Sequence, residues 1–200
     1  MAWRKPMTRF FLWVSVLAWG PLVGAKVFDL VVLAGAWSGA PPQSLRLLPY
    51  GPDYPVDTGE FFIPSSAALL LSTFGALVSG WTTPLQYRGL LVTSALSIFA
   101  TLILTVTIFW PMNGALWAYA SHSPRSIHNE AEIIQLVHTW IMLDWVRVAA
   151  SVVGFVAAIR ALSIPFPDQR APADPLAVTI AFVVSIFGVA AFLVYFVSNI

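Results

Sequence analysis

The sequence predicts an all-α, polytopic membrane helix bundle with four core transmembrane helices and a fifth, C-terminal one. Apolar stretches fall at residues 10–36, 63–81, 89–110, 133–162 and 176–198. Each approaches or exceeds the ~20 residues that a helix needs to cross the hydrocarbon core. The composition agrees, because 58% of the chain is hydrophobic and only 10% is charged, which is typical of a lipid-facing chain. We therefore expect one transmembrane domain over residues 1–200, with the lipid bilayer as its partner.

Charge and cysteine usage exclude several classes of function. The net charge is +1 and the ten Lys and Arg residues are scattered along the chain, so the basic patch that nucleic acids require is missing and we expect no nucleic-acid partner. The chain has no cysteine, which excludes disulfides, thiolate metal sites, iron–sulfur clusters and dithiol chemistry. Any redox chemistry must use another group.

The first stretch, residues 10–36, has basic residues before it and resembles a secretory signal with a small-residue cleavage site at Ala25. Its hydrophobicity continues past Lys26, however, so we interpret it as an uncleaved helix. It is longer than the bilayer requires and must either tilt or project. Lys26 and Asp29 are then expected near an interface.

The orientation follows from the basic residues beside the stretches, because cytoplasmic loops carry an excess of Lys and Arg. With the N-terminus inside, the cytoplasmic segments hold Arg4, Lys5, Arg9, Arg88, Arg160 and Arg170, and the outer segments hold Arg46 and Arg125. We therefore expect a cytoplasmic N-terminus and a C-terminus on the outer side.

The outer connections, residues 37–62 and 111–132, are long, whereas the inner ones are short and rich in proline. A long outer loop is either a lid over an outward cavity or a surface loop without a role. The histidines and acids of this side, His122, His128, Glu130 and His138, lack the spacing of a zinc site, and we predict no metal ligand and no cofactor.

At the end of the third stretch, Trp110 is expected at headgroup level, and Pro111 is expected to end the helix. Asn113 is then held at the outer mouth of the bundle. It is either the cap of a short following helix or an amide that donates to a substrate oxygen.

The fourth stretch carries the strongest pattern in the chain. Trp140, Asp144, Arg147 and Ser151 share one helical face, because their spacings are four, three and four residues. Asp144 and Arg147 can pair at i, i+3. The pair either fixes helix register or belongs to a cavity in which the guanidinium stabilises an anionic oxygen while the carboxylate moves a proton. Ionised groups inside a span are usually functional, which favours the second reading.

His138 lies on another face of the same helix, about 180° from Arg147 and in line with Trp145. It is either a neutral imidazole near the outer interface or a general base.

The residues at the ends of the third and fourth stretches resemble the anthrone oxygenase-like family of small four-helix membrane proteins. The resemblance covers roughly residues 61–163 and rests on Pro111-x-Asn113, a polar linker, and Trp140 followed by Asp144-Trp145-x-Arg147. It implies a four-helix membrane bundle. Some fungal members of the family are associated with cofactor-independent oxidation of anthrones to anthraquinones by O₂, and most bacterial members have no assigned role.

The chain departs from the family pattern at Leu143 and Asp144, where Trp and Asn often occur, and in its 37–62 loop and fifth helix. The resemblance implies that Asn113 and Arg147 stabilise an oxyanion and that Asp144 is the base, with His138 as the alternative base. Trp110, Trp140 and Trp145 would bind a flat apolar aromatic or quinone-like substrate.

The competing prediction is a non-enzymatic bundle, either a binder of lipid or quinone-like molecules or an accessory subunit. Such a subunit would act in a homo-oligomer or a larger membrane complex. A roomy polar cavity would favour an enzyme or a binder, and a closed Asp144–Arg147 pair packed among small residues would favour a subunit.

Overall fold

A computed structural model of the protein describes residues 3–49, 58–123 and 126–167. The first long helix is α1 (Arg4–Phe28), continued by a π-helical turn η1 (Asp29–Leu33) and by α2 (Ala34–Ser38). A short 3₁₀ turn η2 (Gln43–Leu47) and helix α3 (Gly59–Ser79) follow. Helix α4 (Leu85–Leu104) continues through a second π-helical turn η3 (Thr105–Phe109) into α5 (Trp110–Ala120), and α6 (Glu130–Ser163) is the last described helix.

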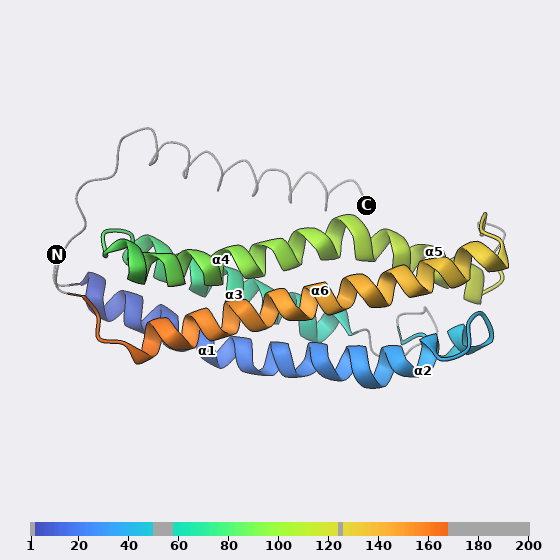
Figure 1. The fold of residues 1–200 in the computed structure, drawn as a ribbon, viewed down its shortest axis with the longest axis horizontal. Helices are drawn as coiled ribbons and strands as arrows, with labels where there is room; N and C mark the ends of the chain where they lie inside the picture. Colours follow the sequence, from blue (N-terminus) through green and yellow to red (C-terminus); the bar gives the residue numbers. More distant parts are fainter. Residues whose placement is uncertain (1–2, 50–57, 124–125, 168–200) are drawn as a thin grey trace.

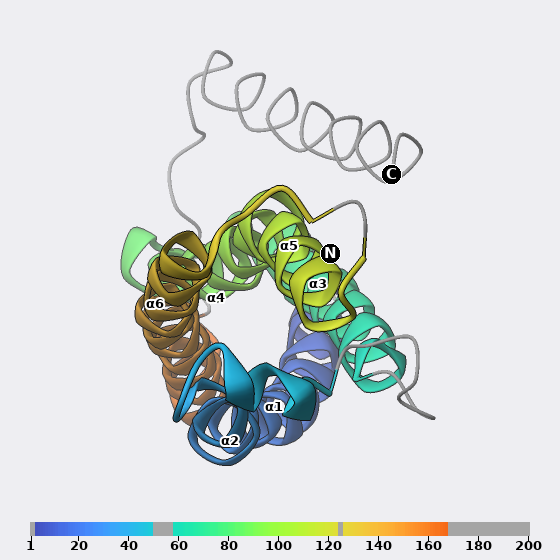
Figure 2. The ribbon, with the colours of Figure 1, turned by 90° about the vertical axis from the view of Figure 1, so that its right-hand side faces the viewer.

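Within the described residues, four continuous helical segments are long and apolar enough to cross a membrane: Arg4–Ser38, Gly59–Ser79, Leu85–Ala120 and Glu130–Ser163. They run antiparallel to their chain neighbours (Figure 1). Helix α1 packs against α3 and α6, and α4 packs against the same two helices. The segments thus form a ring of four, seen end-on in Figure 2. The predicted membrane helix bundle is confirmed, and the predicted fifth stretch, 176–198, lies outside the described residues.

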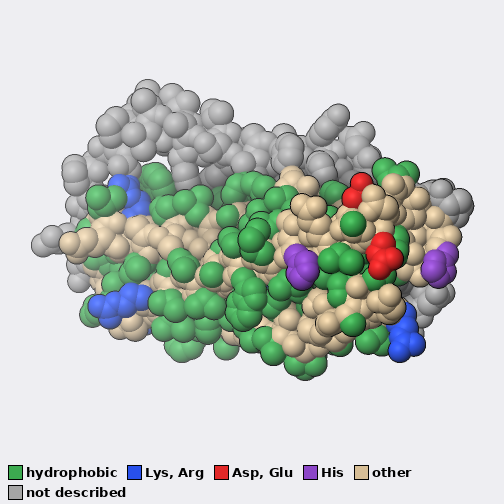
Figure 3. Space-filling model, turned by 45° about the vertical axis from the view of Figure 1, so that its right-hand side comes forward, with side chains coloured by type: hydrophobic (Ala, Val, Ile, Leu, Met, Phe, Trp, Pro, Cys, Tyr) green, Lys and Arg blue, Asp and Glu red, His purple; other side chains and the backbone are tan. Residues whose placement is uncertain are grey.

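The outside of the bundle is apolar. Leu17, Leu71 and Leu96 are among the large hydrophobic side chains that are exposed on its surface. Figure 3 shows hydrophobic side chains over the middle of one face, with charged groups toward the two ends. This distribution suits a helix surface in contact with lipid. The chain is a multi-pass membrane protein.

The third long helix differs from its predicted form. Pro111 was expected to end it, and this is wrong, because the helix continues to Ala120. Pro111 is the second residue of α5 and directly follows the π-helical turn η3. A proline in the first turn of an α-helical segment is tolerated because its missing N–H needs no partner there. The change of register at η3 therefore allows the helix to pass through Pro111.

Hydroxyl-bearing residues join α1 to α3 and α4 in the half of the bundle where α1 begins. Thr8 Oγ1 donates to Ser79 Oγ at 2.9 Å, and Ser15 Oγ donates to Ser72 Oγ at 3.1 Å, both between α1 and α3. The indole of Trp19 donates to Ser94 Oγ on α4 at 3.1 Å. Small polar residues are the usual means of close helix contact in a membrane, where lipid provides no hydrophobic drive for association.

Candidate functional site

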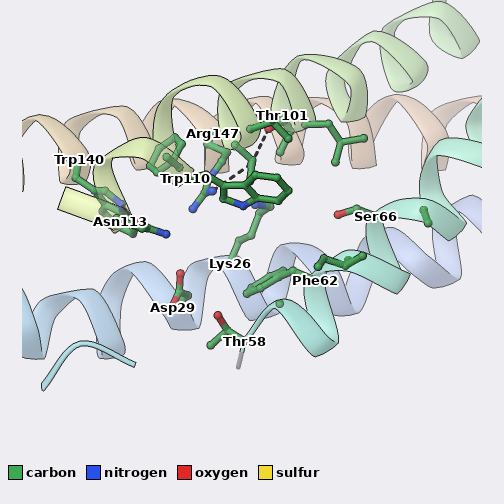
Figure 4. Close-up of a pocket in the computed structure, with 18 of the residues that line it drawn as sticks. Lys26, Asp29, Thr58, Phe62, Ser66, Thr101, Trp110, Asn113, Trp140 and Arg147 are labelled. Atoms are coloured by element: carbon green, nitrogen blue, oxygen red, sulfur yellow. Dashed lines mark hydrogen bonds between the residues drawn. The ribbon is translucent and has the colours of Figure 1, made fainter. Parts of the chain in front are cut away.

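The opposite half of the bundle contains a cavity of about 600 Å³. Its walls come from all four long segments (Figure 4). Apolar and aromatic side chains supply most of its lining. Ile63 and Ala67 of α3 and Gly114 of α5 line the cavity and are exposed, so they form its rim. The cavity is thus reached between α3 and α5.

Both π-helical turns lie at this cavity. Asp29, the first residue of η1, lines it from one side, and Thr105, the first residue of η3, lines it from another. A π-turn inserts an extra residue into the helix and reorients the side chains around it, and such turns are frequent at functional sites. Because the two π-turns belong to different helices and face one cavity, we interpret them as features that orient side chains toward this site.

Arg147 is the central cation of the cavity wall. Its Nε donates to Asp144 Oδ1 at 2.6 Å, and its Nη1 donates to Thr105 Oγ1 at 3.3 Å. The guanidinium carbon lies 3.9 Å from the centre of the Phe109 ring and 5.8 Å from that of Trp140. The predicted i, i+3 pair is therefore confirmed, and a cation–π contact adds to it.

Asp144 stands behind Arg147 and does not line the cavity. Its side chain is only 1% exposed, and its Oδ2 has no hydrogen-bond partner among the described residues. The carboxylate therefore holds the guanidinium in place and has no direct route to a molecule in the cavity.

Asn113 and Trp140 form a second polar unit. The indole Nε1 of Trp140 donates to Asn113 Oδ1 at 2.8 Å. Trp140 is buried and makes edge-to-face contacts with Trp37 at 5.0 Å and Phe109 at 5.2 Å between ring centres. Because the amide oxygen is engaged, the amide NH₂ of Asn113 is the end available to the cavity, and Figure 4 shows it pointing there. The hydrogen bond from Trp140 thus fixes the direction in which the NH₂ group of Asn113 can donate.

The remaining predicted site residues divide into those that line the cavity and those that do not. Trp110 lines the cavity, as do Asn113, Trp140 and Arg147. His138 is exposed and does not line it, and Trp145, which is 55% exposed, does not line it either. At 100° per residue these two side chains are turned well away from Arg147 on the same helix.

Comparison with protein families gives a match that decides the family. The model of the anthrone oxygenase family matches residues 55–157. The chain belongs to the anthrone oxygenase family. The match spans α3 to most of α6, and so includes Asn113, Trp140 and Arg147. No curated protein and no solved structure matches the chain.

Two charged cavity residues come from the first helix, outside the anthrone oxygenase match. We expected Lys26 and Asp29 near an interface, whereas they are buried in the cavity wall, 6% and 4% exposed. The Lys26 amine lies 5.3 Å from the centre of the Phe62 ring. Their i, i+3 spacing repeats that of Asp144 and Arg147, and this was the signal in the sequence. They also share one face of the first segment with the buried hydroxyls of Thr8 and Ser15, so the polar stripe was present in the sequence but its inward direction was not inferred.

Proposed function

We propose that this protein binds a flat apolar aromatic molecule of the anthrone or quinone-like class in the cavity and oxidises it with O₂. The observation that carries the proposal is the combination of aromatic walls with N–H donors that converge from Arg147 and Asn113. A mostly apolar cavity of about 600 Å³ lies within the range of small-molecule sites, which use a few polar groups to orient the ligand.

The proposed reaction needs a base, an oxyanion site and O₂. A base removes one proton from the doubly benzylic carbon of an anthrone and leaves an enolate. O₂ forms a bond to that carbon, the peroxide anion takes the proton back from the base, and the resulting hydroperoxide loses water to leave a second carbonyl. In sum, one anthrone and one O₂ give one anthraquinone and one water. Arg147 and Asn113 both line the cavity, so each can donate a hydrogen bond to the enolate oxygen and stabilise the charge that develops there.

The choice of base changes with the geometry. Asp144 and His138, the two bases that the sequence suggested, do not line the cavity, whereas the Asp29 carboxylate does. We therefore assign proton transfer to Asp29 and give Asp144 the role of positioning Arg147. A base must come within hydrogen-bond reach of the proton that it removes.

The alternative function is that of an accessory subunit in a homo-oligomer or larger membrane complex. The closed Asp144–Arg147 pair, together with the close approach of Gly154 to Trp19, favours it. The cavity favours the oxygenase, because a bundle that serves only as a structural subunit has no need of converging donors.

The test is O₂ uptake by the purified protein in nanodiscs with a panel of anthrones and hydroquinones, with empty nanodiscs to measure autoxidation. We expect saturable uptake, and Arg147→Met should lower it by about 10²-fold or more, the usual loss for one oxyanion donor. Arg160→Met, an exposed arginine at the end of the same helix, is the matched control and should match wild type. Absence of both turnover and saturable binding in wild type would refute the oxygenase and leave the accessory subunit.

A further inference from the structure

Lys26 is a buried amine that forms no ion pair with any described residue. Its side chain lines the cavity and is 6% exposed. Within the described part of the chain, the amine makes no hydrogen bond or ion pair, and it forms a cation–π contact with the Phe62 ring. Asp29 is one turn away, yet the two groups are not in ion-pair contact. A buried charge without a partner is unfavourable, so the amine is poised for a group that enters the cavity.

Lys26 and Arg147 approach the cavity from different helices, α1 and α6. Figure 4 shows the Lys26 side chain extending from α1 toward Arg147 across the space that a ligand would fill. Of the five N–H groups of a guanidinium, the hydrogen bonds to Asp144 and Thr105 use only two. Both cations therefore have donors left for one shared oxygen.

The ionisable groups around this position balance one another. Among the described residues, Lys26 from α1 and Arg147 from α6 are the cations, and Asp29 from η1 and Asp144 from α6 are the carboxylates. Asp144 forms an ion pair with Arg147. If Asp29 accepts a proton from the ligand, the ligand anion replaces it as the second negative charge, and the site stays neutral. The site is thus suited to a ligand that enters neutral and ionises inside.

We propose that the cavity holds its aromatic ligand as an enolate or phenolate whose oxygen lies between Lys26 and Arg147, and that Lys26 selects ligands able to ionise. This rests on the proposed function, because it concerns the same cavity and the same class of ligand. It also goes beyond the family match, because α1, which carries Lys26, lies outside the matched residues.

The test uses 2-hydroxyanthraquinone, whose colour changes when its hydroxyl ionises, and anthraquinone as the matched ligand without that hydroxyl. Each is bound to the protein in nanodiscs, and the hydroxyl is titrated by absorbance. In wild type it should ionise at a pH lower by about one unit or more than in empty nanodiscs, since a nearby opposite charge shifts a pKa by roughly 1–3 units. Lys26→Met should abolish most of this shift, and Lys26→Arg should restore it.

Lys5→Met is the matched control, because Lys5 is exposed near the other end of the same helix, and it should keep the full shift. A full shift in Lys26→Met would overturn the inference while leaving the proposed function intact. So would binding of anthraquinone without binding of its hydroxylated analogue. Failure of both ligands to bind wild type would refute the proposed function and the inference together.

Discussion

The two halves of the bundle use polar side chains in opposite ways. In the packed half, where α1 begins and α6 ends, the buried polar groups include hydroxyls such as Thr8 and Ser15 that are paired with a neighbouring helix. In the hollow half, around the cavity, the buried polar groups include Lys26, Asp29 and Arg147, all of them ionisable. Neutral hydroxyls serve helix contact, whereas charges in a span are costly and indicate a site.

The backbone also differs between the halves, because one is closely packed and the other contains both π-helical turns. Gly154 brings α6 against the Trp19 ring in the packed half. In the hollow half, η1 and η3 interrupt the regular helix at Asp29 and Thr105. A close-packed region is difficult to deform, so we interpret the packed half as the rigid support that allows the hollow half to keep unpaired donors in place.

Thiol labelling can determine which side of the membrane the hollow half faces, and its outcome is all-or-none. The proposed orientation places the hollow half on the outer side. Cysteines introduced at Gln43 in η2 and at Gln86 in α4 occupy exposed positions at the two ends, in a chain without cysteine. In intact cells, Gln43→Cys should react with an impermeant thiol reagent, and Gln86→Cys should react only after permeabilisation. The reverse pattern would place the cavity on the cytoplasmic side.

The largest effect on stability is expected in the hollow half. Arg147→Ala leaves Asp144, which is 1% exposed, without its partner, and breaking a buried pair costs about 3–5 kcal/mol. The free energy of unfolding, measured by denaturation in mixed micelles, should fall by that amount. Arg160→Ala at the exposed end of α6 should change it by less than about 0.5 kcal/mol.

A second variant separates the lost pair from general damage to the helix. Adding Asp144→Asn to Arg147→Ala removes the unpaired charge, so the double variant should be more stable than Arg147→Ala alone. A double variant that is equally unstable would show that the pair does not explain the loss.

The sequence predicted the parts of this comparison that depend on spacing along one helix. The i, i+3 pair of Asp144 and Arg147 and the separate face of His138 follow from 100° per residue. The family resemblance brought Asn113 and Trp140 together with them, and the structure joins those two by a hydrogen bond. The Asp144–Arg147 pair and the face of His138 need no knowledge of the neighbouring helices, and only the resemblance linked residues of two different helices.

The features that the sequence did not predict depend on contacts between helices or on register. Lys26 and Asp29 share a polar face of the first segment with Thr8 and Ser15, but only the packing of α1 showed that this face meets the cavity. The continuation of the helix through Pro111 depends on the π-turn η3. A π-turn shifts the helical register, so it leaves no simple periodic pattern in the sequence from which it could be predicted. Asp144 was read as a base because its helix face was known but its depth behind Arg147 was not.

The smallest expected effect belongs to the packed half. An added Cβ at Gly154 would lie 2.6 Å from Trp19 Cζ2 and 2.7 Å from Ser97 Cβ, so Gly154→Ala must move one of the helices. Overpacking of this kind costs about 1–3 kcal/mol, measurable by the same denaturation in micelles. Gly24→Ala is the matched control, since nothing lies within 4 Å of its Cβ, and it should be neutral or stabilise by up to about 1 kcal/mol.

If the packed half supports the hollow one, Gly154→Ala should also weaken the binding of an aromatic ligand in the cavity, although Gly154 does not line it. The movement of α6 that relieves the contact with Trp19 also displaces Arg147, two turns away on the same rigid helix. Loss of stability with unchanged binding would show instead that the two halves are mechanically independent.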